Sequence, residues 1–334
     1  MPPRSQRPQR KKKSKISKAP GFLPGAFLSL GKAGLMSGET LDDLTIVIPV
    51  YRCAKYLPST VNSALACDGA KILISDDASG DNTPATARRL TDENPARITL
   101  VENPQNLGMT GNWNSAFRQV QTPWALKLDG DDLIAAQYVQ QAMEFLRAGK
   151  DVGVTAGRFA RIGAQDNLDS PPALDESPVE LKKISGDDAL DFIFRWDPSP
   201  CSASMIFQMQ AWRDVGGFDP KLNWCSDREI WFRIARHHPV GWYSGTAAWY
   251  RVLDTSVTAA YKNADQFCFE LSYMFAQAGK IWNQPELKGK FRAAYFHNAG
   301  SCVKSIWRRA KRGEFTGMGS RLAEAMKNLD RMMR

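Results

Sequence analysis

The chain is 334 residues long, with 43% hydrophobic residues, 24% charged residues and a formal net charge of +9. This composition is that of a globular protein with a substantial core, and it excludes fibrous and disulfide-scaffold classes. The ends carry most of the charge, +8 in residues 1–20 and +6 in residues 301–334, so the body between them is mildly acidic at about −5.

Residues 1–20 hold too little apolar surface to fold, so we expect a disordered basic tail, followed by a glycine-rich linker to residue 41. The apolar stretch at residues 21–30 is short and interrupted by Pro24 and Gly25, so we expect no signal peptide. The sequence contains no run of 18 apolar residues, so no membrane-spanning helix is predicted. The six cysteines are scattered without metal-ligand spacing, which favours a reducing cytoplasm over a disulfide framework or a zinc site.

Residues 44–50, LTIVIPV, form a continuous apolar run of the kind expected of a parallel strand buried on both faces. Further strands are predicted at residues 71–75, 98–101, 124–128 and 152–156. Helices are predicted at residues 54–66, 84–93 and 135–146, and a further helix is predicted to follow the segment at residues 106–114 and to end at residue 120. Strands alternating with helices at this spacing predict an α/β fold with a mostly parallel sheet flanked by helices.

The turn after the first strand, residues 50–54, contains no glycine and so lacks the dinucleotide-binding fingerprint. Polar side chains instead follow three of the strands: Asp76 and Asp77, Asn106 and Asn114, and Asp129 and Asp131. The carboxyl ends of parallel strands share one edge of the sheet, where α/β proteins bind ligands. Carboxylates there suit ribose hydroxyls, a base N–H, or a metal ion that itself binds phosphate.

Asp129, Asp131 and Asp132 crowd three carboxylates around Gly130 at the end of the strand at residues 124–128. Two such charges ~4 Å apart repel by about 4 kcal/mol at an effective dielectric near 20. They therefore require bulk water or a cation, and oxygen ligands suit Mg²⁺ or Mn²⁺. The alternative is an exposed Asp-Gly turn without a ligand.

Several motifs in order resemble the family-two, GT-A-type glycosyltransferases of cell-surface polysaccharide synthesis. The resemblance covers residues 44–258 and rests on TIVIPVYRCAKYLPSTVNSAL, ISDDASGDNT, NLGMTGNWNSAF, LKLDGDDL, MIFQMQAWRDVGGFD and WCSDREIWFRIA. It implies a GT-A sheet over residues 42–260, preceded by the tail and linker at 1–41 and followed by a helical extension at 261–334.

The resemblance also implies site residues. Asp77 would accept the N3–H of uracil or thymine, beside Pro49 and Tyr51, with Asp76 supporting the loop. Asn106, Gly108 and Asn114 would shape the pocket beside the diphosphate. Asp129 would contact ribose or metal, Asp131 would coordinate the divalent cation, and Asp132 would support the loop or orient the sugar.

Asp227 would be the general base of a single displacement, which inverts the anomeric centre. It also stands at a predicted helix start, where a carboxylate cap is common. Two positions depart from the family pattern: Ser226 stands where Glu often precedes the base, and Leu253 where many relatives have His. Arg251 would meet the diphosphate or pair with a local acid.

Trp196 and Trp224 are candidates to flank the acceptor, because aromatic faces suit sugar rings, although tryptophan is also a common core residue. Helices are predicted at residues 265–280, 287–311 and 320–333. The last is basic and amphipathic, which fits peripheral contact with an anionic inner leaflet near a lipid-linked acceptor, or packing on the protein.

The sequence therefore predicts a metal-dependent inverting glycosyltransferase that uses a UDP- or dTDP-sugar. Two alternatives stay open: a retired GT-A scaffold that binds through its basic ends, and a sugar nucleotidyltransferase. The latter would carry a glycine-rich basic loop after the first strand, which this chain lacks. Nucleic acid is not expected as a partner, because the basic residues sit at the ends and not on aromatic-studded strands.

Overall fold

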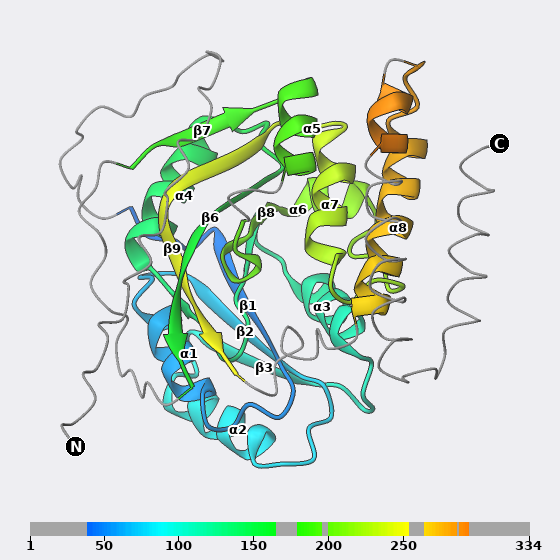
Figure 1. Cartoon of the computed structure of the whole chain (residues 1–334). Coiled ribbons are helices and arrows are strands. Elements are labelled where there is room, and N and C mark those ends of the chain that lie inside the picture. The colour runs from blue at the N-terminus through cyan, green and yellow to red at the C-terminus, as the bar shows by residue number, and fades with distance from the viewer. Residues whose placement is uncertain (1–38, 165–178, 196–199, 254–263, 286, 294–334) are drawn as a thin grey trace, which may run out of the picture.

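The computed structural model describes residues 39–164, 179–195, 200–253, 264–285 and 287–293. This part of the chain forms a nine-stranded sheet with helices on both faces (Figure 1). The strands are β1 (Leu44–Val50), β2 (Lys71–Asp76), β3 (Ile98–Glu102), β4 (Trp124–Lys127), β5 (Leu133–Ile134), β6 (Val154–Gly163), β7 (Leu181–Ile184), β8 (Ile206–Gln208) and β9 (Val240–Val252).

The helices alternate with the strands in the first half of the chain and gather toward its end. They are α1 (Leu57–Leu65), α2 (Thr83–Glu93), α3 (Met109–Gln119), α4 (Ala136–Ala148), α5 (Gly186–Arg195), α6 (Met209–Asp214), α7 (Ser226–Ala235) and α8 (Ala264–Ile281), with a 3-10 turn η1 at Ser202–Ser204. The predicted strands and helices of residues 44–156 are therefore all present, most of them within two or three residues of the predicted ends.

The sheet runs in the order β3-β2-β1-β4-β8-β6-β9-β5, with β7 paired to β9. The strands β3, β2, β1 and β4 are parallel neighbours, so their carboxyl ends lie along one edge. β8 is antiparallel to both β4 and β6, and β9 is parallel to β6. β5 and β7 are both antiparallel to β9. The prediction of a sheet flanked by helices is confirmed, and its strands are parallel from β3 to β4 and mixed beyond β4.

Alternate residues of the central strands pack into two separate cores. On β1, Ile46 and Ile48 face the core that includes α1, α2 and α4, while Val47 faces the core that includes α3, α7 and α8. All three side chains are fully buried, and each contributes roughly 1.5–3 kcal/mol of apolar burial. Burial on both faces explains why the strand reads as an unbroken apolar run.

The helix α8 belongs to the second core although it lies beyond the predicted catalytic domain. Its residues Met274 and Phe275 are buried in that core, together with Trp282 just after the helix. Trp282 Nε1 also donates a hydrogen bond to the carbonyl of Phe232 in α7 (3.0 Å). The described part of the extension thus packs directly on α7, and the domain boundary at residue 260 stays a prediction.

Several predicted features lie outside the described residues: the tail and linker up to residue 38, Trp196, most of the helix at 287–311 and the amphipathic helix at 320–333. Within the described ranges, no helix is both long enough and apolar enough to cross a membrane.

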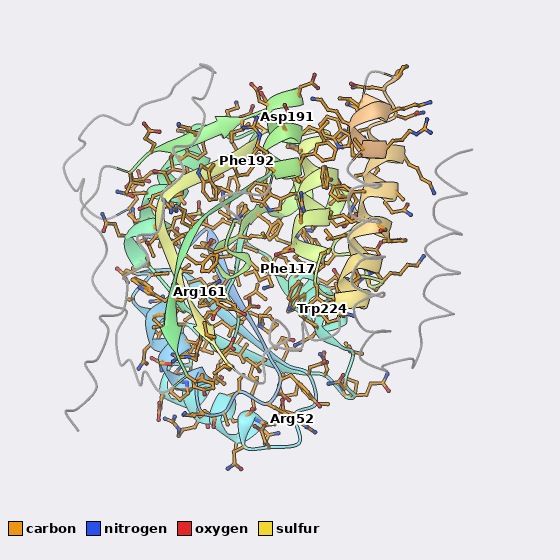
Figure 2. All side chains as sticks on the ribbon, in the orientation of Figure 1. Arg52, Phe117, Arg161, Asp191, Phe192 and Trp224 are labelled. Carbon is orange, nitrogen blue, oxygen red and sulfur yellow. The ribbon has the colours of Figure 1, made fainter. Side chains whose placement is uncertain are left out.

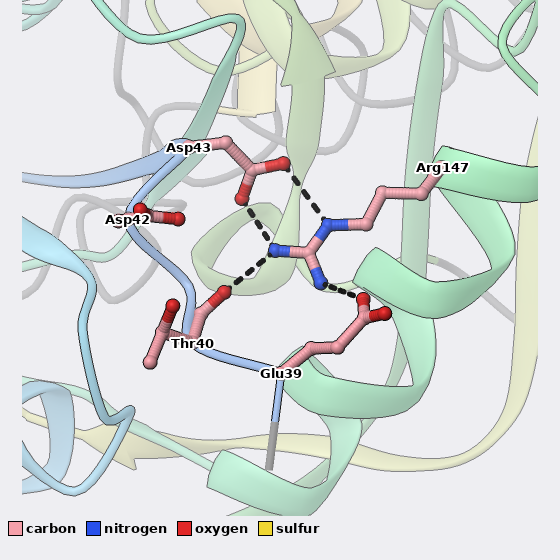
Figure 3. A pocket seen from close by; sticks show the side chains of 5 residues that line it. All are labelled: Glu39, Thr40, Asp42, Asp43 and Arg147. Atoms are coloured by element: carbon pink, nitrogen blue, oxygen red, sulfur yellow. Dashed lines mark hydrogen bonds and ion pairs between the residues drawn. The ribbon is translucent and has the colours of Figure 1, made fainter.

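The amino end of β1 carries an ion-paired hollow lined by Glu39, Thr40, Asp42, Asp43 and Arg147 (Figure 3). Arg147 of α4 donates to both carboxylate oxygens of Asp43 (2.6 and 3.0 Å), to Glu39 (2.9 Å) and to the carbonyl of Thr40 (2.8 Å). These bonds fasten the incoming chain to α4. The hollow lies at the opposite end of β1 from the predicted donor-site carboxylates.

Candidate active site

The loop after β4 is pressed against the end of β1. A side chain at Gly130 would place its Cβ 2.8 Å from Val50 Cγ1, 2.9 Å from Cys53 Sγ and 3.3 Å from the carbonyl of Pro49. The hydroxyl of Thr60 donates to the Gly130 carbonyl at 3.1 Å. Only glycine fits this approach without displacement, so the close packing fixes the carboxylates on either side of Gly130.

Lys127, the last residue of β4, carries a buried cation into this loop. Its ammonium donates to Asp129 Oδ1 at 2.5 Å and to Ser202 Oγ at 2.9 Å, and it lies 3.9 Å from the centre of the Trp113 ring. The side chain is fully buried, whereas that of Asp129 is 29% exposed. Sequence reasoning treated Lys127 as a strand residue only, yet it neutralises the first carboxylate of the motif.

Asp131 and Asp132 share the loop with Asp129, and both have raised pKa values. Burial, and then the charge of Asp129, raise the pKa of Asp131 to about 6. Asp132 is buried, and burial together with its two acidic neighbours raises its pKa well above the usual range. Its Oδ1 accepts the backbone N–H of Arg251 (2.7 Å), while Oδ2 has no partner within the described part of the chain.

Arg251 of β9 lies beneath this loop. Its Nε donates to the carbonyl of Asp131 (2.8 Å), another guanidinium nitrogen donates to the carbonyl of Gly163 (3.1 Å), and the group lies 4.8 Å from the centre of the Tyr56 ring. The side chain is 1% exposed. These contacts hold the backbone of the carboxylate loop, and direct contact with a diphosphate stays a prediction.

Asp77, just after β2, is held at one carboxylate oxygen. Its Oδ1 accepts from the side-chain amide of Asn103 (3.1 Å) and from the backbone N–H of Leu107 (2.8 Å). Asn106 Nδ2 donates to the Asp77 carbonyl (3.1 Å), and Asn106 Oδ1 accepts from the N–H of Gly108 (3.1 Å). The loop after β3 is therefore fastened to Asp77, with Asn103 as a partner that the sequence did not reveal.

Asp76 braces the turn beside Asp77. Its Oδ2 accepts the backbone N–H of Ser79 (3.0 Å), and its Oδ1 is buried with no partner within the described residues. Ser79 Oγ in turn accepts the N–H of Arg52, whose guanidinium lies 5.1 Å from the centre of the Tyr51 ring. Tyr51 is 47% exposed at the end of β1, two residues after Pro49, so its ring is accessible to a ligand.

Asn114 faces a neighbouring loop of the protein. Its Nδ2 donates to the carbonyl of Phe218 (2.8 Å) and its Oδ1 accepts the N–H of the same residue (2.9 Å). Gly217 permits this approach, since a side chain there would meet Asn114 Oδ1 at 2.7 Å. The observed contacts make Asn114 a link between α3 and the loop that leads to α7, and its predicted place beside a diphosphate is untested.

Asp227 lies in the first turn of α7 and is half-buried. Its Oδ1 accepts the N–H of Arg228 at 2.7 Å, while the helix cap is Cys225, so Asp227 is not the capping residue. Burial raises the pKa of Asp227 to about 6; the cation of Lys127 acts to lower that pKa and the charge of Asp129 acts to raise it. Asp227 is thus close enough to the loop after β4 for the charges there to affect its pKa.

Trp224 precedes this helix and is partly exposed, next to the early part of α8 (Figure 2). The backbone N–H groups of Asn223, Trp224 and Cys225 all donate to one buried carboxylate on α8, that of Glu270. No sequence signal links Glu270 to these three residues, because 45 to 47 residues separate them along the chain. The second candidate for the acceptor side, Trp196, lies outside the described residues.

The chemistry of the loop after β4 fits a hard divalent cation. Asp129 and Asp131 offer oxygen ligands only. Burial, and then the charge of Asp129, raise the pKa of Asp131, and a cation would stabilise its ionised form. Among the described residues, no three His, Cys, Asp or Glu side chains form a ready-made metal cluster. Such a cation would therefore need oxygens from a bound ligand, as is usual for Mg²⁺ with phosphates.

Comparison with known proteins gives one matching family. The model described as Glycosyl transferase family 2 matches residues 45–210. Succinoglycan biosynthesis protein ExoO of Rhizobium meliloti (strain 1021) is 28% identical over 108 residues, 32% of this chain and 30% of that protein. An uncharacterized glycosyltransferase of Nostoc sp. is 26% identical over 202 residues, 60% of this chain and 55% of that protein. The matches span about half the length of these relatives or less.

Solved structures share the fold over most of the chain. The crystal structure of S. aureus TarS 1-349 has a TM-score of 0.55 at 14% identity and covers 87% of this chain and 80% of that chain. A TarS complex with UDP-GlcNAc has a TM-score of 0.52 at 13% identity, covering 85% and 88%. Mannosyltransferase PcManGT from Pyrobaculum calidifontis, in complex with GDP-Man and Mn²⁺, has a TM-score of 0.54 at 16% identity, covering 86% and 87%.

Proposed function

The chain belongs to glycosyl transferase family 2, and we propose that it moves a sugar from a UDP- or dTDP-sugar to a hydroxyl group of a saccharide or lipid-linked acceptor. The observation that carries this proposal is the loop after β4, whose Asp129 and Asp131 are held against the end of β1 beside the buried ammonium of Lys127. A donor diphosphate and its cation need such carboxylates, and a single displacement also needs a base on the acceptor side, which Asp227 would supply.

The state of Asp77 supports a pyrimidine nucleotide. Its Oδ1 already accepts two hydrogen bonds, from Asn103 and Leu107, so the carboxylate has one oxygen left for a ligand. Uracil and thymine present one N–H on their pairing edge, whereas guanine presents both N1–H and an amino group. Tyr51, exposed at the end of β1, would lie against the base or the ribose.

The divalent cation, Mn²⁺ or Mg²⁺, would be held by Asp131, with Asp129 placed for the ribose or for the same ion. When bound, it supplies neutralisation of the charge that develops on the leaving diphosphate. The ammonium of Lys127 neutralises the charge of Asp129, so Asp131 would be the main ligand of the cation. The hydrogen bonds of Arg251 to Asp132 and to the carbonyl of Asp131 stabilise the conformation of this loop.

Asp227 would take the proton of the attacking acceptor hydroxyl. The acceptor oxygen then forms its bond to the anomeric carbon while the bond from that carbon to the diphosphate oxygen breaks, which inverts the configuration. A pKa raised to about 6 is suited to this task, because the carboxylate is ionised at neutral pH yet more basic than an ordinary Asp. Trp224 would flank the acceptor sugar.

Cell-surface polysaccharide synthesis is the proposed setting, in the cytoplasm or at the inner face of the membrane. The printed name of the Rhizobium relative, a succinoglycan biosynthesis protein, supports that setting. The resemblance of the motifs to polysaccharide-type transferases supports it as well.

The test is turnover of a panel of UDP-, dTDP- and GDP-sugars by the purified full chain with Mn²⁺, measured as release of the nucleoside diphosphate with and without simple sugar acceptors. We expect one pyrimidine donor to be consumed by the wild-type protein and not by Asp227→Asn. Consumption of none of the panel by a folded protein that also fails to bind these nucleotides would contradict the proposal and favour a retired scaffold.

A further inference from the structure

A carboxylate of the C-terminal extension, that of Glu270, binds the turn that precedes the proposed base in the chain. Glu270 lies in the first half of α8, 60 residues beyond the segment that the family model matches. Its side chain is 1% exposed. Its Oε2 accepts three backbone N–H groups in a row, from Asn223 (3.0 Å), Trp224 (2.7 Å) and Cys225 (3.2 Å).

These three donors belong to the turn that leads into α7. Asn223 and Trp224 precede α7, and Cys225 is its capping residue and makes no side-chain capping bond, so none of the three N–H groups has an acceptor in an earlier turn of α7. Glu270 supplies an acceptor from another element, separated by 45 to 47 residues along the chain. Hydrogen bonds from several N–H groups to one carboxylate are stronger than neutral ones, and they offset the burial of the charge.

A second set of contacts holds α8 against the residues on either side of this turn. The hydroxyl of Tyr273 donates to Asp219 Oδ2 at 2.9 Å, and the guanidinium of Arg228 lies 5.2 Å from the centre of the Phe275 ring. Phe275 is also buried in the core shared with α7. Tyr273 and Phe275 therefore hold α8 against the segment that contains the turn at residues 223–225.

Asp227 stands two residues beyond this turn, and Trp224 is a member of it. We propose that Glu270 is a positioning residue for transfer: it holds the turn at residues 223–225 and so sets where Asp227 and Trp224 meet the acceptor. The proposal rests on the proposed function, because it concerns the base of that reaction. It makes the extension a component of the active site, although the family model ends before it.

The experiment compares three variants of the full chain with the donor that the panel identifies. Glu270→Ala removes the acceptor of all three N–H groups. Glu270→Gln keeps an amide oxygen at the same place. Met274→Ala loosens the packing of α8 and leaves the carboxylate, so it is the matched control for general destabilisation.

For Glu270→Ala we expect kcat to fall about 10- to 100-fold, because a displacement of the reacting groups by about 1 Å can have an effect of that size. The donor Kd should change less than twofold, since the donor site lies on other elements. Glu270→Gln should recover most of kcat, and Met274→Ala should keep kcat below its own unfolding temperature. Amide hydrogen exchange in residues 222–226 should quicken in Glu270→Ala and not in Glu270→Gln.

The outcomes separate the two proposals. A wild-type protein that turns over no donor overturns the proposed function and this inference with it. An active wild type with an unchanged kcat in Glu270→Ala, or an equal loss in Met274→Ala, overturns this inference alone. A parallel loss of donor affinity in Glu270→Ala would also contradict it, because a positioning role on the acceptor side leaves donor binding intact.

Discussion

The carboxyl group of Asp227 combines a raised pKa, near 6, with a place in the first turn of α7. As a base it must be ionised, so kcat should rise with pH through about 6 and level off above it. Asp227→Asn should abolish this dependence by lowering kcat at least 100-fold, within the usual contribution of general base catalysis, while donor affinity stays the same. Steady-state rates between pH 5 and 8, with donor titrations of both proteins, check it. A near-normal rate in the variant would remove Asp227 as the base.

The same raised pKa has a consequence for stability. Asp227 binds its proton more tightly in the folded state than in the unfolded state, so folding favours the neutral form. Its contribution to stability is full below the ordinary Asp pKa near 4 and is lost as pH rises through about 6. Asp227→Asn should therefore be more stable than wild type at pH 7–8, by on the order of 1–2 kcal/mol, and the difference should vanish near pH 4. Denaturant unfolding at both pH values measures it, and a less stable variant at pH 8 would contradict it.

Lys127 affords a prediction about the metal ion. Its ammonium bonds Asp129 at 2.5 Å, so its charge opposes binding of a divalent cation to the same loop. Lys127→Met, of similar length, should tighten Mn²⁺ binding at least tenfold, because one positive charge within several ångströms has an effect of a few kcal/mol at an effective dielectric near 20, and about 1.4 kcal/mol is already tenfold. Lys127→Arg is the matched control that keeps the charge. Calorimetric titration of each variant with Mn²⁺ alone measures this affinity. Weaker Mn²⁺ binding to a folded Lys127→Met would contradict the prediction, because it would show that the Lys127 ammonium favours Mn²⁺ binding.

At this scale the sequence shows the carboxylates but not what they touch. Asp129, Asp131 and Asp227 stand in recognisable motifs, so their types and spacing suffice to select them. Lys127 sits in an apolar strand, where alternation shows that it is inside but not that its ammonium reaches Asp129. Asn114 belongs to a recognisable motif as well, yet its reciprocal bonds to Phe218 depend on a loop 104 residues away.

Among the elements, β1 and the loop after β4 pack closely at Gly130. Gly130→Ala would bring Cβ within 3 Å of Val50 and Cys53, so the loop must move away from β1. We expect a loss of roughly 1–3 kcal/mol in stability, as for overpacked cores, and a weaker donor affinity because Asp129 and Asp131 flank the glycine. Thermal unfolding and donor titration measure both effects. Adding Val50→Ala removes one of the clashing groups and should restore part of each; no restoration would contradict the packing argument.

Much of the first half of the chain is predictable by element because β1, β2 and β4 are buried apolar runs and strands alternate with helices. Other elements carry weaker signals. β8 has three residues and β5 two, too few to show a period, and β9 is a 13-residue strand that is only partly buried. β6 extends to Gly163, beyond the predicted end at 156, because it pairs with β9 along its whole length. Such pairings are set by contacts distant in sequence.

Over the whole molecule, the candidate site combines residues from the carboxyl ends of the strands with residues from α7, which packs in the second core. The carboxylates predicted to face the donor follow β2 and β4, at one edge of the sheet. Asp227 belongs to α7, which packs with α3 and α8 in the second core. The predicted division at residue 260 reflects where the family resemblance stops. The packing of α8 against α7 depends on side chains such as Phe275 and Trp282, whose partners the sequence does not name.

We propose that the protein binds a pyrimidine nucleoside diphosphate with the help of a divalent cation. Calorimetric titration of the full chain with UDP, dTDP and GDP, each with Mn²⁺ and with EDTA, tests this directly, alongside Asp131→Ala and Asp77→Asn. We expect UDP or dTDP to bind with Mn²⁺. Its affinity should fall at least tenfold in EDTA or in Asp131→Ala, and the preference over GDP should be lost in Asp77→Asn. No binding of any nucleotide to the folded protein, or equal binding with EDTA and in Asp131→Ala, would contradict the proposed donor site.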